Sequence, residues 1–127
     1  MGAALEHVNI TVSDPARTAA MLCDVFGWTV RWSGPAKSGG RTFHVGDADT
    51  YLAVYTPPPG AQLGAADSAL HGGLNHVGVL VDDLDAVEMR VRDAGLTPFN
   101  HGDYAPGRRF YFLDHDGVEF EVVSYAA

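Results

Sequence analysis

The stretch "LEHVNITVSD", Leu5–Asp14, returns later in the chain in a similar form as "GLNHVGVLVDD", Gly73–Asp83. In both, a histidine stands two residues after a leucine, a valine follows it, and an acidic residue precedes an apolar periodic segment. The offset between His7 and His76 is 76 − 7 = 69 residues. A sequence that repeats itself in this way predicts two copies of one structural unit.

The internal alignment continues beyond the two histidines, although its offset falls to 68 after the first predicted helix. The aligned pairs are then Arg41 with Arg109, Phe43 with Tyr111, Leu52 with Phe120 and Ala53 with Glu121. One residue deleted from a loop explains the change of offset. We therefore predict a module over residues 4–57, a linker rich in Pro, Gly and Ala over 58–71, and a second module over 72–125.

Each module has the predicted order βαβββ. The segment "HVNITV" (7–12) alternates apolar and polar residues, as a strand does. The next segment predicts a helix with Ser13 or Asp14 as its N-cap, Pro15 in its first turn and Gly27 at its end. Further strands are expected over 28–32, 41–46 and 50–56, and the second module repeats the pattern with a strand over 76–81, a helix over 82–95 and strands over 97–102, 108–114 and 118–125.

These elements predict an α+β fold in which one module is too small to cover its own sheet. We expect a single domain over residues 1–127, with both modules forming a curved mixed sheet around a cleft and the helices outside. Because side chains alternate between the faces of a strand, the apolar set of each strand meets the helix and the other set faces the cleft. The cleft set is His7, Asn9, Thr11, Tyr51, Ala53, Tyr55, His76, Glu119, Glu121 and Val123.

Two imidazoles and a carboxylate in this cleft set predict a centre for one divalent metal ion. His7 and His76 occupy equivalent positions of the two modules. Glu121 lies in the last strand, at a position whose side chain is expected on the same cleft face. Imidazole and carboxylate ligands suit Fe(II), Ni, Co, Mn or Zn and leave coordination positions open. The alternative is that each histidine is a polar side chain bonded to a neighbour, and that Glu121 is solvated like Glu119.

The segment "FLDHDGVEFEVV" (112–123) resembles the Phe-x-Asp-Pro-Asp-Gly-x-x-x-Glu ending of the vicinal oxygen chelate superfamily. This superfamily includes glyoxalase I, extradiol dioxygenases, and fosfomycin and bleomycin resistance proteins. The resemblance covers nearly the whole chain, and His115 stands where the motif has proline. The family's ligand positions match His7, Ala53, His76 and Glu121. Since alanine is not a ligand, the remaining His, His, Glu set is similar to that of the extradiol dioxygenases.

The resemblance implies a metal-dependent enzyme that binds a small oxygenated substrate through two oxygens, with dioxygenase or lyase/isomerase chemistry both open. Tyr111, ten residues before Glu121 as in the extradiol signature, is the candidate acid/base or hydrogen-bonding group, or else a core aromatic. Tyr51, Tyr55 and Arg109 are candidate substrate contacts, or else packing and solvated residues. The competing functions are a metal-free small-ligand binding protein of the bleomycin-resistance type and a partner-binding domain.

Composition limits the partners and the location of the protein. The 127 residues are 46% hydrophobic, enough for a core, and the formal net charge of −8 argues against nucleic acid and anionic membranes as partners. One cysteine, no apolar segment of membrane-spanning length and no signal peptide favour a cytoplasmic protein. The family resemblance also implies a homodimer.

Overall fold

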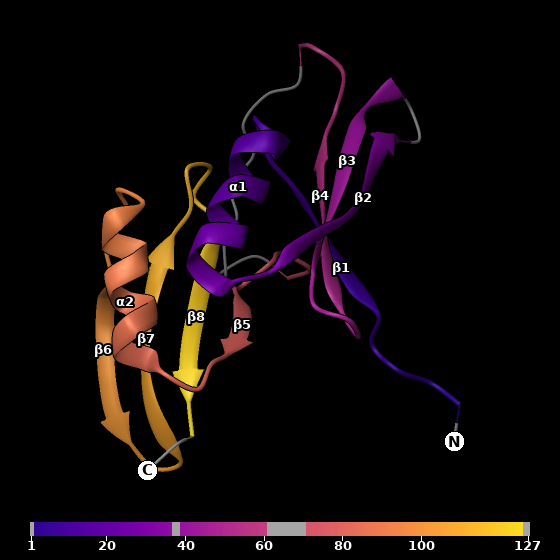
Figure 1. Ribbon diagram of the computed structural model, residues 1–127. Coiled ribbons are helices and arrows are strands. Elements are labelled where there is room, and N and C mark those ends of the chain that lie inside the picture. Colours follow the sequence, from indigo (N-terminus) through magenta and orange to yellow (C-terminus); the bar gives the residue numbers. More distant parts are fainter. Residues whose placement is uncertain (1, 37–38, 61–70, 126–127) are drawn as a thin grey trace. The chain divides into compact units, whose positions relative to one another are not determined.

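The secondary structure follows the order βαβββ twice, as the sequence predicts. The computed structural model describes residues 2–36, 39–60 and 71–125. The chain divides into two units, Met1–Leu63 and Gly64–Ala127, each with one helix and one four-stranded sheet (Figure 1). The predicted α+β fold class is therefore confirmed.

The first unit contains β1 (His7–Thr11), α1 (Pro15–Phe26), β2 (Thr29–Pro35), β3 (Arg41–Gly46) and β4 (Tyr51–Thr56). Its strand order is β1-β4-β3-β2, with β1 parallel to β4 and the other pairs antiparallel. Helix α1 packs on β3 and β4, and the fully buried core of this unit includes Leu22, Val25, Val45 and Val54.

The second unit contains β5 (Val77–Leu80), α2 (Leu84–Asp93), β6 (Phe99–Tyr104), β7 (Gly107–Leu113) and β8 (Glu119–Ser124). Its strand order, β5-β8-β7-β6, repeats that of the first unit, again with one parallel pair. Helix α2 packs on β7 and β8, and the fully buried core here includes Val91, Phe110, Phe112, Phe120 and Val122.

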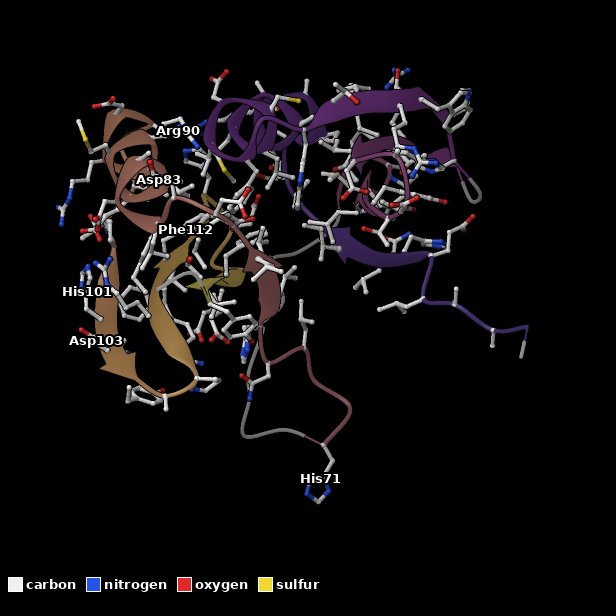
Figure 2. The ribbon with its side chains drawn as sticks, turned by 60° about the horizontal axis from the view of Figure 1, so that its bottom comes forward. His71, Asp83, Arg90, His101, Asp103 and Phe112 are labelled. Carbon is white, nitrogen blue, oxygen red and sulfur yellow. The ribbon has the colours of Figure 1, made fainter. Side chains whose placement is uncertain are left out.

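Both helices begin with an aspartate cap, as expected for a turn that leads from a strand into a helix. Of the two candidates at the first helix, Asp14 is the N-cap, and its side chain accepts a hydrogen bond from the backbone N–H of Arg17 at 3.1 Å. Asp83 caps α2 in the same way (Figure 2). Gly27 ends α1 with φ of 71°, a left-handed conformation that glycine adopts without steric cost.

Alternation along β1 and β4 places the apolar residues of the first unit as predicted, except at Val8. Ile10, Leu52 and Val54 are buried on the helix side of the first sheet. Val8 was expected with them but is 37% exposed, because β1 is the edge strand of its sheet. The predicted linker lies largely in residues 61–70, outside the described residues. Neither helix in the described part of the chain has the length and apolar character needed to span a membrane.

The hairpin registers show that the internal alignment of β3 with β7 is wrong by one residue. His44 pairs with Ala53 in the first unit, and Tyr111 pairs with Glu121 in the second. Since Ala53 corresponds to Glu121, His44 corresponds to Tyr111, and the offset here is 111 − 44 = 67. The physical reason is the loop length, because residues 47–50 connect the first hairpin and residues 114–118, one more, connect the second.

The corrected register changes which residues are equivalent in the two units. The residue that corresponds to Arg109 is Thr42 and not Arg41, because 109 − 67 = 42. In the first strand of each unit, Asn9 pairs with Ala53 and Gly78 pairs with Glu121. Since Ala53 corresponds to Glu121, Asn9 corresponds to Gly78, and the offset at these strands stays at 78 − 9 = 69. The histidines that begin the repeat are therefore equivalent, as predicted.

Asp114, in the β7–β8 loop, makes the stability of the protein depend on pH. Its Oδ1 accepts hydrogen bonds from the backbone N–H groups of Asp116 and Val118 at 2.8 and 2.9 Å. Its Oδ2 is buried and has no partner among the described residues. Burial raises the pKa of this carboxyl above its ordinary value of 3.8, despite the two hydrogen bonds that lower it.

We expect Asp114→Asn to remove this pH dependence. The native state binds the proton more tightly than the unfolded chain, so the wild-type free energy of unfolding falls as pH rises from about 3.8 through the raised native pKa. The difference in free energy of unfolding between the Asp114→Asn variant and the wild type should therefore move in favour of the variant as pH rises from about 3 to about 7 in urea unfolding. A constant difference over this range would show that the carboxyl is not perturbed.

Candidate metal and substrate site

His7 is held by two neighbours on the first sheet. Its Nδ1 lies 2.9 Å from Oε1 of Glu6, and the hydroxyl of Tyr51 donates to the same oxygen at 3.3 Å. A carboxylate can only accept, so Nδ1 carries the proton and the lone pair is on Nε2. This arrangement, in which a carboxylate fixes the other ring nitrogen, is typical of histidines that bind metals through Nε2.

A row of four rings crosses the first sheet and includes His7. Tyr51 stacks on His7 with ring centroids 4.9 Å apart and on His44 at 4.4 Å, and Trp32 lies 5.1 Å from His44. The four residues come from β1, β4, β3 and β2, the spatial order of the strands. The guanidinium of Arg31 lies over the Tyr51 ring at 4.8 Å. These contacts limit the rotation of the His7 ring.

The same face of the first unit carries a concavity of about 500 Å³. Its lining consists of His7, Asn9, Ala36, Thr42, His44, Tyr51, Ala53 and Tyr55. The predicted substrate contacts Tyr51 and Tyr55 both belong to it. Burial is the main reason that the pKa of His44 is lowered, with like charges from His7 and Arg31 adding to it, and this favours a neutral ring. Oγ1 of Thr42 is buried without a partner among the described residues.

His76 and Glu121 lie together in the second unit. Nε2 of His76 is 3.0 Å from Oε1 of Glu121, and Nδ1 of His76 is 2.7 Å from Oδ1 of Asn75. Asn75 precedes His76 in the sequence as Glu6 precedes His7, so each histidine has an oxygen acceptor on its Nδ1 from the residue before it. In the first unit Nε2 is thus the nitrogen with the lone pair, whereas in the second unit Nε2 faces the acceptor Oε1 of Glu121 and must lose its hydrogen before it can bind a metal.

The separation of Nε2 and Oε1 fits two ligands of one ion. Nitrogen and oxygen ligands lie about 2.1 Å from a first-row metal, and two ligands at a right angle are then about 3.0 Å apart. The distance between His76 Nε2 and Glu121 Oε1 is 3.0 Å. The donor set, one imidazole and one carboxylate, is also the one that these ions prefer.

Arg109 binds the other oxygen of Glu121. Nη1 of Arg109 donates to Oε2 at 3.0 Å, and the two side chains are only 14% and 12% exposed. The ring of Tyr104 lies 4.7 Å from the guanidinium carbon. Arg109 was expected as a substrate contact, and the structure adds a second task, because the ion pair fixes the orientation of Glu121.

Tyr111 lies beside both of these residues. It pairs with Glu121 across β7 and β8, and its ring meets that of His76 edge-on with centroids 5.9 Å apart. Burial, followed by the negative charge of Glu121, raises the pKa of the phenol. The hydroxyl therefore stays protonated at neutral pH and can donate a hydrogen bond. Tyr111 is half-buried, and its role as an acid/base or hydrogen-bonding group or as a core aromatic stays a prediction.

The three residues of the predicted metal centre belong to two different units of the chain. His76 and Glu121 belong to the second unit and His7 to the first, and among residues 2–36, 39–60 and 71–125 no three His, Cys, Asp or Glu side chains gather into a metal site. His101 is bonded to Glu88 at 3.0 Å, and His71 lies in the exposed loop before β5 (Figure 2).

The site residues that were not predicted from the sequence include Glu6, Asn75, Thr42 and His44. Glu6 and Asn75 had a detectable signal, because a side chain with an oxygen acceptor precedes the histidine in both copies of the repeat. Alternation in the strand over 41–46 already places Thr42 and His44 on the face opposite Val45, and the corrected register aligns them with Arg109 and Tyr111.

Known proteins resemble this chain in both sequence and structure. The family model described as Glyoxalase/Bleomycin resistance protein/Dioxygenase superfamily matches residues 4–122. A glyoxylase/bleomycin resistance protein/dioxygenase domain from Frankia sp. EAN1pec has a similar structure, with a TM-score of 0.81 and 20% identity over 96% of this chain and 97% of that one. No curated protein matches the sequence.

Two fosfomycin resistance proteins are also similar in structure. FosX from Mesorhizobium loti has a TM-score of 0.73 and 26% identity over 97% of this chain and 92% of that one. A mutant FosX from Listeria monocytogenes, solved with Mn(II) and 1S,2S-dihydroxypropylphosphonic acid, has a TM-score of 0.76 and 21% identity over 97% of this chain and 93% of that one.

Proposed function

Because the chain belongs to the glyoxalase/bleomycin resistance protein/dioxygenase superfamily, we propose that it is a metal-dependent enzyme acting on a small oxygenated molecule. The proposed centre holds one divalent ion with His7, His76 and Glu121. The reaction belongs to the dioxygenase or the lyase/isomerase class. A homodimer and a cytoplasmic location remain predictions from the sequence.

The observation that supports this proposal is the contact that each of the two histidines makes through its Nδ1 atom. Each has its Nδ1 against an oxygen of the preceding residue, at 2.9 Å for His7 and 2.7 Å for His76. Histidines that bind a metal through one ring nitrogen almost always have such a partner on the other, and here the feature occurs at equivalent positions of both units. The presence of Mn(II) in one similar FosX structure supports a divalent ion in this fold.

The residues around the proposed centre have distinct tasks. A bound ion supplies positive charge for two adjacent substrate oxygens. Arg109 holds Glu121 in place through the bond to Oε2. Tyr111 donates its phenolic hydrogen bond to a substrate oxygen, since its raised pKa keeps the proton on the phenol. Tyr51 and Tyr55 contact the substrate from the concavity of the first unit.

Metal titration of the whole chain tests the proposal, with Asn75→Ala as the diagnostic variant. We expect about one divalent ion per chain in the wild type, by elemental analysis after purification without chelator. Loss of the Asn75 acceptor should weaken metal affinity roughly 10- to 100-fold, as for other outer-shell partners of metal-binding histidines. Asn100→Ala, an exposed asparagine on β6, is the control and should leave the affinity unchanged.

Wild-type protein without stoichiometric metal after incubation with Fe(II), Mn, Co, Ni and Zn would refute the proposed centre. The reaction class is separated by a second measurement, in which anaerobically Fe(II)-loaded protein is mixed with catechol and air. Oxygen uptake assigns the dioxygenase class, and isomerase or lyase activity with Ni, Co or Zn assigns the other.

A further inference from the structure

We infer that Arg109 is a binding site for an oxyanion of the substrate, a carboxylate or a phosphonate, through its Nε and Nη2 atoms. This inference rests on the proposed function and narrows it, because it adds an acidic group to the substrate class. In this inference the guanidinium has two functions. Its Nη1 atom binds Glu121, and its Nε and Nη2 atoms bind the substrate.

The free nitrogens of Arg109 are the two that form a fork. Nη1 is used by Glu121 at 3.0 Å, whereas Nε and Nη2 are buried and have no partner among the described residues. The N–H groups of Nε and Nη2 point in the same direction, and they match the two oxygens of a carboxylate or phosphonate. The unused edge is therefore the edge that recognises such anions.

Leaving these donors unpaired has a cost, since buried N–H groups without acceptors lose their hydrogen bonds to water. The chain nevertheless holds the guanidinium firmly in place. Tyr104 covers one of its faces, and Gly102 makes room for that ring, because a Cβ on Gly102 would lie 2.7 Å from Cε1 of Tyr104. A ligand that supplies the missing acceptor would explain why the guanidinium is held in place while two of its buried donors are unpaired.

The first unit gives an independent indication that this position faces a ligand. Thr42 corresponds to Arg109 in the corrected register, and it lines the concavity. Its Oγ1 is likewise buried without a partner in the part of the chain that the structure describes. The two units have different residues at this position but share the feature of an unused buried donor on the face away from the helix.

The charges on this face favour a single anionic group. Glu119 and Glu121 contribute two negative charges and Arg109 one positive charge, so a bound divalent ion brings the sum to +1. Without the ion the sum is −1, and an anion should bind weakly. The anion and the metal are therefore expected to bind together.

The test uses pyruvate and acetylphosphonate, which share an acetyl group and differ in the anion, and acetoin, which has two vicinal oxygens and no charge. Binding to the metal-loaded full chain is measured by calorimetry for wild type and Arg109→Lys. Lysine can keep the ion pair with Glu121 but has no fork. We expect the affinity for pyruvate, acetylphosphonate or both to fall about tenfold or more in the variant, with that for acetoin unchanged.

A second readout needs no variant. The Nε–H resonance of Arg109 in the wild type should shift on addition of the anions and not on addition of acetoin. Equal anion affinities in wild type and Arg109→Lys, or an unmoved Nε–H resonance, would overturn the inference and leave Arg109 as the partner of Glu121 only. Metal content is measured first in both proteins, so a failure of the metal centre itself is seen separately.

Discussion

Glu121→Ala is expected to raise the dissociation constant for a divalent ion more than about 100-fold, a loss of at least about 2.8 kcal/mol. The substitution removes the carboxylate oxygen that lies 3.0 Å from Nε2 of His76. It also leaves Arg109 without the acceptor of its Nη1, so an unpaired positive charge remains where the ion would bind. Both effects act against metal binding.

Glu119→Ala is the matched control for this change. Glu119 lies on the same strand and the same face as Glu121, two residues away, and has the same charge. We expect its removal to change metal affinity less than about threefold, because only the long-range charge is lost. Equal losses in the two variants would mean that the carboxylates attract the ion without binding it.

His7→Ala and His76→Ala separate the contributions of the two units to the centre. Each should raise the dissociation constant by a similar factor to Glu121→Ala if all three residues bind one ion. An unchanged affinity in His7→Ala, together with a loss in His76→Ala, would restrict the centre to the second unit. Isothermal titration with Mn(II), Zn(II) and Ni(II) measures all of these variants.

Phe120→Ala is expected to lower the free energy of unfolding by about 3–5 kcal/mol. The Phe120 side chain is completely buried and stacks on Phe112, with ring centroids 5.1 Å apart and planes 7° from parallel. Truncation removes buried apolar surface and leaves a cavity that the surrounding β-sheet can only partly fill. Urea unfolding followed by circular dichroism measures the loss.

Tyr125→Ala is the control, since Tyr125 follows the same strand but is 58% exposed. Its effect should stay within about 0.5 kcal/mol. A loss of less than about 1 kcal/mol for Phe120→Ala would mean that the second unit relaxes around the cavity, contrary to the close packing of its core.

The sequence alone predicts much of this protein because the decisive patterns are local. The repeat beginning at His7 and His76, the alternation in each strand and the Asp and Gly signals at the helix ends predict the βαβββ order. Parity also identifies the residues on the face away from the helix, since successive strand residues point to opposite sides. These inferences need no knowledge of which strands are neighbours.

Other features depend on contacts between strands, and only the tertiary structure decides them. The placement of β4 between β1 and β3 brings Tyr51 between His7 and His44, and a loop one residue longer shifts β7 so that Arg109, and not Arg108, meets Glu121. Hairpin register reverses the face of every side chain when it moves by one residue. Composition and periodicity contain no such information, so the partners of the site residues follow from the fold.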